Sequence, residues 1–198
     1  MRDLYISYNK LKVINQTLFT SLVKLERLDL NNNEIEYIHP LAFRGFNGSL
    51  EKLDLSYNRL KSLNKLLFKR MTNLESLLVH NNEITSLESF QFGHECKKLE
   101  LLDLQYNKLA SIEENAFNGL TGLKWLLLTG NHLKSLQPLM FNGLISLEKL
   151  DLDDNNLMSI DQFTFKGLVK LTELDLMHNN ISNFDPALFH GLHATINL

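Results

Sequence analysis

One pattern recurs along the whole chain with a period of 24 or 25 residues, and it constrains the fold more than any other feature. Six copies have 24 residues and two have 25, and the copies begin at Met1, Leu25, Leu50, Leu74, Leu99, Leu123, Leu147 and Leu171. Each copy contains the run x-L-x-L-x, which predicts a short strand with one buried face. One strand per short repeat indicates a stack of turns that bury a continuous core between neighbours.

Two further positions hold the same residue type in every copy. The ninth position is always asparagine: Asn9, Asn33, Asn58, Asn82, Asn107, Asn131, Asn155 and Asn179. The nineteenth is always phenylalanine: Phe19, Phe43, Phe68, Phe92, Phe117, Phe141, Phe165 and Phe189. A carboxamide both donates and accepts, so a column of asparagines can pair the backbone groups left open where each strand ends. The phenyl rings can stack on the opposite side of the coil and close the core there.

The consensus L-x-x-L-x-L-x-x-N-x-L is the sequence signature of a leucine-rich solenoid. We therefore expect an α/β solenoid, a leucine-rich repeat arc with a concave parallel β-sheet and a mostly irregular or short-helical convex side. The whole chain, residues 1–198, then forms one solenoid with eight repeats at 1–24, 25–49, 50–73, 74–98, 99–122, 123–146, 147–170 and 171–194, plus the start of a ninth at 195–198. Neither end has a capping sequence, so we interpret the chain as an uncapped fragment of a longer array.

The second half of the repeat resembles that of animal extracellular leucine-rich repeat proteins of the typical 24-residue subclass. The segments that carry the resemblance are AFNGL (116–120), MFNGL (140–144), TFKGL (164–168) and LFHGL (188–192). The subclass includes Toll-like receptor ectodomains, chaoptin-like adhesion proteins and Slit-like guidance proteins, and the resemblance covers essentially the whole chain. It implies a receptor or adhesion segment that is extracellular or at the cell surface. The chain departs from the subclass in having no cysteine-rich caps.

Charge and composition narrow the expected partners. The formal net charge is -3, so there is no electrostatic reason to expect nucleic acid or an anionic membrane as a partner. No run approaches the ~20 apolar residues of a membrane span, so a membrane would be reached only through flanking segments. The single cysteine, Cys96, excludes an internal disulfide framework.

No group of residues in the sequence predicts catalysis, a cofactor or a metal, so we do not expect an enzyme. DLDDN (151–155) resembles the start of a calcium loop, but Asn156 and Gln162 stand where that loop needs glycine and glutamate. His190 and His193 lack further ligands. Cys96 lies three residues before a repeat start, where leucine stands in other copies, and is expected to be a buried apolar residue.

Three sequons for N-glycosylation occur, at Asn15, Asn47 and Asn180. Their number is close to chance. Asn15 and Asn47 lie in the return path of their repeats, where a glycan would leave the sheet free. Asn180 lies beside Asn179, at the border of the concave face. Modification of at least one is expected if the protein is secreted.

The outward positions of the predicted strands are mostly polar, with one exception. The third and fifth positions should face solvent, and most hold charged residues. Four large apolar residues from three consecutive repeats interrupt them, and we call these the central apolar patch: Leu78, Leu101, Trp125 and Leu127. Tyr106 is expected at its edge, and Asp103 and Asp151 in a charged rim. An apolar centre with a polar rim is typical of a protein-binding surface.

The sequence therefore predicts a module that recognises a protein or peptide ligand on its concave face. Two alternatives remain open. One is an intracellular leucine-rich repeat scaffold or regulator, with which a lone cysteine is compatible. The other is a structural adhesion module that self-associates as a homodimer through the same patch.

Overall fold

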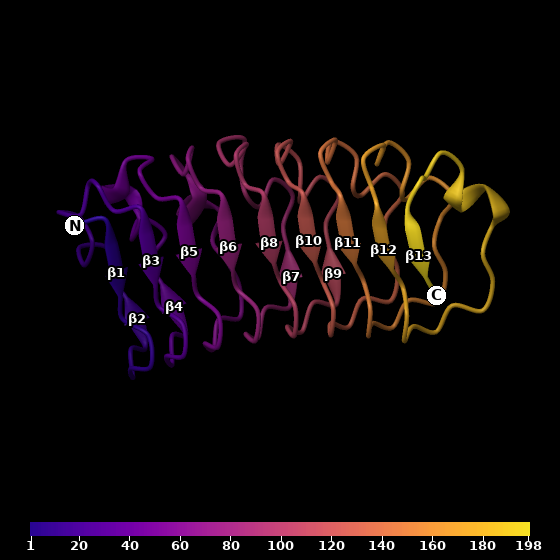
Figure 1. Ribbon diagram of the computed structural model, residues 1–198. Helices are drawn as coiled ribbons and strands as arrows, with labels where there is room; N and C mark the ends of the chain where they lie inside the picture. Colours follow the sequence, from indigo (N-terminus) through magenta and orange to yellow (C-terminus); the bar gives the residue numbers. More distant parts are fainter.

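The computed structural model describes all residues, 1–198, as a row of stacked turns (Figure 1). The main sheet has nine parallel strands, all of three residues: β1 Asp3–Tyr5, β3 Arg27–Asp29, β5 Lys52–Asp54, β6 Ser76–Leu78, β8 Leu101–Asp103, β10 Trp125–Leu127, β11 Lys149–Asp151, β12 Glu173–Asp175 and β13 Thr195–Asn197. They lie side by side in chain order, and the two termini lie at opposite ends. The expected solenoid is confirmed.

The register of the sheet follows from the repeat. Equivalent positions of successive copies face each other, so that Leu126 pairs with Leu102 on one side and with Leu150 on the other. The central leucine of each strand from β3 to β12 is buried, whereas its neighbours in the strand face the concave side. Consequently the third and fifth positions of all repeats form two columns across one continuous surface.

Each strand ends in a turn that the asparagine column holds in place. The residue before each of the eight asparagines has a left-handed backbone, for example Tyr106 at φ 51°. The Nδ2 atom of Asn131 then donates to the carbonyl oxygens of Leu104 (3.1 Å) and Leu128 (2.9 Å), and its Oδ1 atom accepts from the amide of Leu109 (3.0 Å). The side chain therefore links its own turn to the preceding one, as expected from its chemistry.

A single cluster of 52 buried residues fills the space between the sheet and the return path. The phenylalanines stack within it, with ring centroids 6.4 Å apart for Phe92 and Phe117 and 6.0 Å apart for Phe117 and Phe141. Phe46 adds a further ring against Phe43 (5.7 Å). Phe189, in the last full turn, is only partly buried because fewer turns cover it.

The return path is mostly turns, with three single-turn 3-10 helices: η1 Arg44–Phe46, η2 Lys65–Phe68 and η3 Pro186–Phe189. Two short parallel ladders were not expected from the sequence. They pair β2 (Val13–Ile14) with β4 (Tyr37–Ile38) and β7 (Ser86–Leu87) with β9 (Ser111–Ile112). None of the helices is long and apolar enough to cross a bilayer.

The last strand adds a detail about the end of the eighth repeat. Thr195 pairs with Glu173, which is the third residue of its repeat. Thr195 is therefore the third residue of the ninth copy. The expected boundary at residue 195 would have made it the first residue. In the register of the sheet, the ninth copy starts at His193, and the eighth turn is two residues shorter than the 24-residue period predicts.

Candidate functional site

The central apolar patch lies across three adjacent strands, β6, β8 and β10. Leu101 and Trp125 are direct partners in the register, and Leu127 lies on the same strand as Trp125. Leu78 lies on β6, whose third-position residue pairs with Leu101. Trp125 is 46 % exposed, and the three leucines are partly exposed. The structure therefore brings the four residues together on one face.

Asp103 does not lie in the rim of the patch, which is where the sequence predicts it. The register puts it between Leu78 and Leu127, in the middle of the patch, and it is only 9 % exposed. Its Oδ1 atom accepts hydrogen bonds from the backbone amide (3.1 Å) and the Nε2 atom (3.2 Å) of Gln105. The fifth-position column runs without a break through β6, β8 and β10, so two leucines flank this carboxylate. Asp103 is therefore a central residue and not a rim residue.

Asp151 lies at the C-terminal border of the patch, where it pairs in register with Leu127. Beside it, Lys149 pairs in register with Trp125 and forms an ion pair with Glu173 at 2.6 Å. The hydrogen bond to Glu173 raises the pKa of Lys149 above its ordinary value, although partial burial opposes the shift. This border of the patch is therefore charged on both positions of the strand.

Tyr106 lies in the turn that follows β8, three residues after the strand ends. Its ring lies against Gly130, where a Cβ atom would be only 2.5 Å from the Cδ1 atom of the ring. Gly130 itself has φ 67°, which glycine adopts without strain. Tyr106 remains 53 % exposed. The absence of a side chain at residue 130 therefore provides the space in which an exposed aromatic ring is seated.

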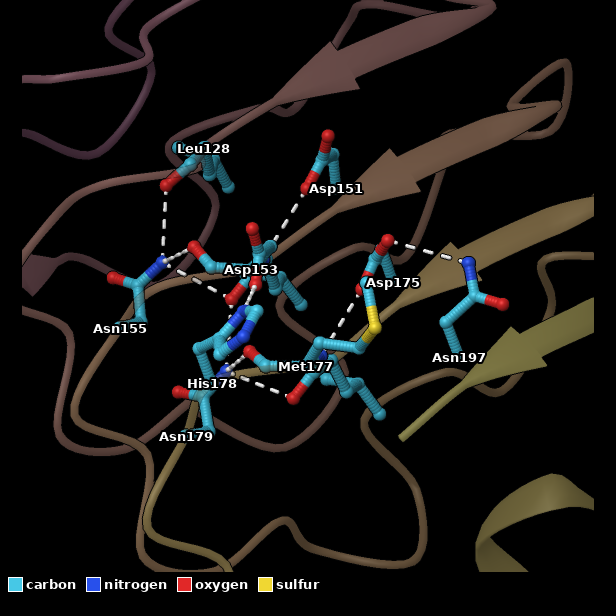
Figure 2. A network of polar contacts seen from close by, with 11 residues as sticks. Leu128, Asp151, Asp153, Asn155, Asp175, Met177, His178, Asn179 and Asn197 are labelled. Carbon is cyan, nitrogen blue, oxygen red and sulfur yellow. Dashed lines mark hydrogen bonds and ion pairs between the residues drawn. The ribbon is translucent and has the colours of Figure 1, made fainter.

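The C-terminal end of the sheet face is acidic (Figure 2). Figure 2 shows Asp151, Asp153 and Asp175 on neighbouring turns, with His178 beside Asp153. The Nδ1 atom of His178 lies 2.7 Å from Oδ1 of Asp153. The hydrogen bond and the negative charge of Asp153, followed by the charges of Asp154 and Asp175, raise the pKa of His178 above its ordinary value. Protonation of His178 therefore adds a positive charge to an otherwise acidic area.

The other side of the patch continues into a hollow of about 180 Å³ on β1, β3, β5 and β6. Tyr5, Lys52 and Asp54 line it, and Leu78 is shared with the central apolar patch. Tyr5 is 65 % exposed. The concave face thus has three parts in order: a hollow lined by polar and aromatic groups, the apolar patch, and the acidic end.

The remaining candidates lie away from this face or in the core. Cys96 is fully buried, and desolvation raises the pKa of its thiol to about 12. Its predicted place in the core is confirmed. No group of three or more His, Cys, Asp or Glu side chains is arranged to hold a metal ion.

All three sequon asparagines are exposed. Asn15 accepts hydrogen bonds from the amide and hydroxyl of Thr17, both at 3.1 Å. Asn47 follows η1 with a left-handed backbone at φ 48°. Asn180 donates its backbone amide to the carbonyl of Leu157 (2.9 Å) and leaves its side chain at the surface. Their glycosylation stays a prediction.

The sequence matches the family described as leucine rich repeat over residues 1–60, 48–94, 72–133 and 145–198. Among solved structures it is similar to the TLR13–ssRNA13 complex, with a TM-score of 0.78 and 26% identity, covering 100% of this chain and 32% of that chain. It is also similar to the octameric complex of Latrophilin 3, Unc5D and FLRT2 (LRR), with a TM-score of 0.81 and 27% identity, covering 97% of this chain and 58% of that chain. A comparison with curated proteins finds no match.

Both similar structures are complexes, so this fold occurs in proteins that bind partners. The chain spans about a third of the first of them and somewhat over half of the second. The first complex contains single-stranded RNA. The expectation of no nucleic acid partner, which rested on net charge, is therefore partly at odds with this similarity.

Proposed function

Because the chain belongs to the leucine-rich repeat family, we propose that it is the recognition part of an extracellular or cell-surface receptor or adhesion protein. In this proposal it has no catalytic role. It binds a protein ligand on the concave face, with the central apolar patch and Tyr106 as anchors. Innate immune receptors and cell adhesion proteins are the two classes that the resemblance of the repeats suggests.

The observation that carries the proposal is the exposure of Trp125 beside Leu101 on a face that is otherwise polar. A soluble sheet face gains nothing from an exposed tryptophan, whereas burying the exposed part of its ring in an interface contributes on the order of 3 kcal/mol. Tryptophan and tyrosine are the residues most enriched among binding hot spots. Each strand is held in place by the repeats on either side of it, so the sheet is rigid before a ligand binds. Binding therefore orders few additional side chains.

The surroundings of the patch indicate the chemistry of the ligand. An apolar protrusion fits against Trp125 and the leucines, and the acidic end formed by Asp151, Asp153 and Asp175 favours basic residues beside that protrusion. Asp103 at the centre favours a hydrogen-bond donor there, because its hydrogen bonds from Gln105 go to the Oδ1 atom and an apolar cover would bury the Oδ2 atom without a donor. The ligand surface is therefore apolar with a donor at its centre and basic groups on one side.

The proposal is tested by screening the purified chain, as a labelled tetramer, against cells that each display one extracellular protein. The parent is compared with Trp125→Asp/Leu127→Asp. Val169→Asp/Ile145→Asp is the matched control, because both residues are exposed apolar residues outside the sheet. All three proteins are first checked for equal folding by circular dichroism.

We expect the screen to find a displayed protein that binds the parent and the control but does not bind the patch variant, Trp125→Asp/Leu127→Asp. Equal binding by all three proteins would contradict the proposal that the central apolar patch binds the ligand. The self-association alternative is tested in parallel by sedimentation velocity. A dimer of the parent that the patch variant cannot form, together with no ligand in the screen, would support an adhesion module that pairs with itself and would contradict the proposal.

A further inference from the structure

A second surface with a distinct chemistry lies on the convex side, between the second and third repeats. A hollow of about 400 Å³ is lined there by Leu41, Arg44, Leu66, Lys69 and Arg70. Three of its five lining residues are cations, and none is an acid. The hollow lies on the opposite side of the solenoid from the central apolar patch and takes no part in the proposed function.

Two of the three cations converge because the repeat places them at equivalent positions, and the third is adjacent in the chain. Arg44 is in η1 and Lys69 directly follows η2, and each is the twentieth residue of its own repeat. Arg70 follows Lys69 with a left-handed backbone at φ 73°. Because consecutive turns stack in register, three exposed positive charges from two turns border one recess.

None of these three cations has an acidic partner. Arg59, Lys108 and Lys124 each form an ion pair with a glutamate of the preceding repeat. Arg44, Lys69 and Arg70 take part in none of the ion pairs of the chain. Like charges that share a recess without counter-charges repel one another, and an anion that binds there relieves this repulsion.

We propose that this hollow binds sulfate groups of a linear sulfated polysaccharide. Two guanidinium groups and an ammonium group can donate several hydrogen bonds to the oxygens of a sulfate ester. The side chains of Leu41 and Leu66 form an apolar wall against which the C–H face of a sugar ring packs.

The direction of the charges favours a long polyanion over a single anionic group. Arg44 and Lys69 follow each other along the solenoid axis, so the charges of successive repeats form a row. Bases of a nucleic acid would require aromatic platforms, and none lines the hollow. A flat membrane surface would contact projecting groups rather than the inside of a recess.

The test is isothermal titration of the whole chain with a heparin-derived octasaccharide and, separately, with the same octasaccharide after removal of its sulfates. The triple variant Arg44→Gln/Lys69→Gln/Arg70→Asn removes the three charges, and asparagine is used at residue 70 because it tolerates a left-handed backbone. Lys134→Gln/Lys166→Gln/Lys170→Gln is the matched control, because it removes three exposed lysines of the C-terminal half that form no ion pair.

The expected result is binding of the sulfated octasaccharide that weakens with added salt, a loss of about tenfold or more in the triple variant, and a loss of less than about twofold in the control. The octasaccharide without sulfate should not bind. Trp125→Asp/Leu127→Asp should bind the sulfated octasaccharide as the parent does, so the outcome is independent of the proposed ligand on the concave face.

Three results would overturn the inference. The first is no binding of the sulfated octasaccharide by a parent that is folded according to circular dichroism. The second is an equal loss in the triple variant and the control, which would show that only total charge matters. The third is stronger binding of a single-stranded RNA dodecamer, or of vesicles that contain phosphatidylserine, than of the octasaccharide. The single variant Arg44→Gln replaces the triple variant if the latter does not fold.

Discussion

The asparagine at the ninth position of each repeat stabilises the fold through hydrogen bonds to the backbone. The side chain of Asn131 is only 3 % exposed, and it bonds to backbone groups of its own repeat and of the preceding one. The groups that it satisfies have no other partner in a strand ladder because the chain leaves the sheet there. A buried polar group without a partner costs more than a typical hydrogen bond contributes, so the column is required rather than merely favourable.

Asn131→Ala is therefore expected to lower the free energy of unfolding by roughly 1–3 kcal/mol. It leaves the amide of Leu109 unpaired in the interior and removes one of the two asparagine hydrogen bonds that the carbonyls of Leu104 and Leu128 each accept. Urea denaturation followed by circular dichroism measures the change. Asn9→Ala is the matched control, because Asn9 is exposed and its side chain donates only to carbonyls of its own turn. A loss of equal size in both variants would contradict the interior role of the column.

His178 is expected to titrate above the ordinary histidine pKa of 6.5, because its hydrogen bond to Asp153 and the surrounding negative charges favour the protonated ring. With a raised folded-state pKa, the stabilising contribution of the pair is fully present below the unfolded-state pKa and is lost as the pH rises through the folded-state pKa. Histidine ring resonances in a pH titration by NMR measure this. Asp153→Asn should move the midpoint of His178 down, and an unchanged midpoint would show that the carboxylate does not control it.

At the scale of the element, the repeating unit is a three-residue strand followed by a left-handed residue and the asparagine turn. The left-handed position holds tyrosine, asparagine, aspartate, histidine or glycine in different repeats. Gly130 is the only glycine among them, and the ring of Tyr106 occupies the space beside it. One turn is therefore shaped by the side chain of the turn before it.

Gly130→Ala should destabilise the protein by about 1 kcal/mol through its left-handed backbone and by a further amount through the clash with Tyr106. Gly191→Ala separates the two effects, because its φ is 82° and nothing lies within 4 Å of the added Cβ atom. Thermal unfolding compares the two variants. Adding Tyr106→Ala to Gly130→Ala should recover the difference between them, and no recovery would mean that the ring is not held there.

The sequence predicts those elements that every repeat shares. The strands, the asparagine column and the buried Cys96 follow from residues at fixed positions, because the same local environment recurs in each turn. The ladders β2–β4 and β7–β9 lie at the thirteenth and fourteenth positions of their repeats but form only in some of them. The fourteenth residue is apolar in every copy, so the period does not predict which copies pair. The register of Thr195 also departs from the repeat count, since pairing with β12 and not the spacing decides it.

The site was predictable in part. The four apolar residues of the patch share two columns, so their proximity follows from the period alone. The burial of Asp103 depends on Leu78 and Leu127 in the neighbouring strands. The position of the Tyr106 ring depends on Gly130 in the next repeat. The convex hollow depends on the course of the return path, which the strand pattern does not describe. The repeat pattern therefore does not predict contacts between neighbouring repeats that involve residues outside the consensus.

At the scale of the whole molecule, the array is nearly one-dimensional, because each turn packs chiefly against the turns before and after it. The strands at the two ends have one neighbour in the sheet, whereas β8 has two. The aromatic column is also complete in the middle, where Phe117 stacks between Phe92 and Phe141. Stability should therefore be highest at the centre, which is where the central apolar patch lies.

Hydrogen exchange followed by mass spectrometry should show this gradient. Amides of β8 and β10 are expected to exchange most slowly, and those of β1 and β13 most quickly, because an end turn opens with the loss of one interface only. Peptides that contain the asparagine turns serve as internal references. Uniform protection along the chain would indicate that the array unfolds as a single cooperative unit and would contradict this expectation.

The two faces of the solenoid have different chemistry, and we propose that the concave face recognises a protein ligand. The most direct test is the dissociation constant of a ligand from the display screen for the parent, Trp125→Asp/Leu127→Asp and Val169→Asp/Ile145→Asp. We expect the patch variant to bind about 100-fold more weakly than the parent and the affinity of the control to change by less than about threefold. Equal affinity of the parent and the patch variant would contradict the claim that the central apolar patch is the binding site.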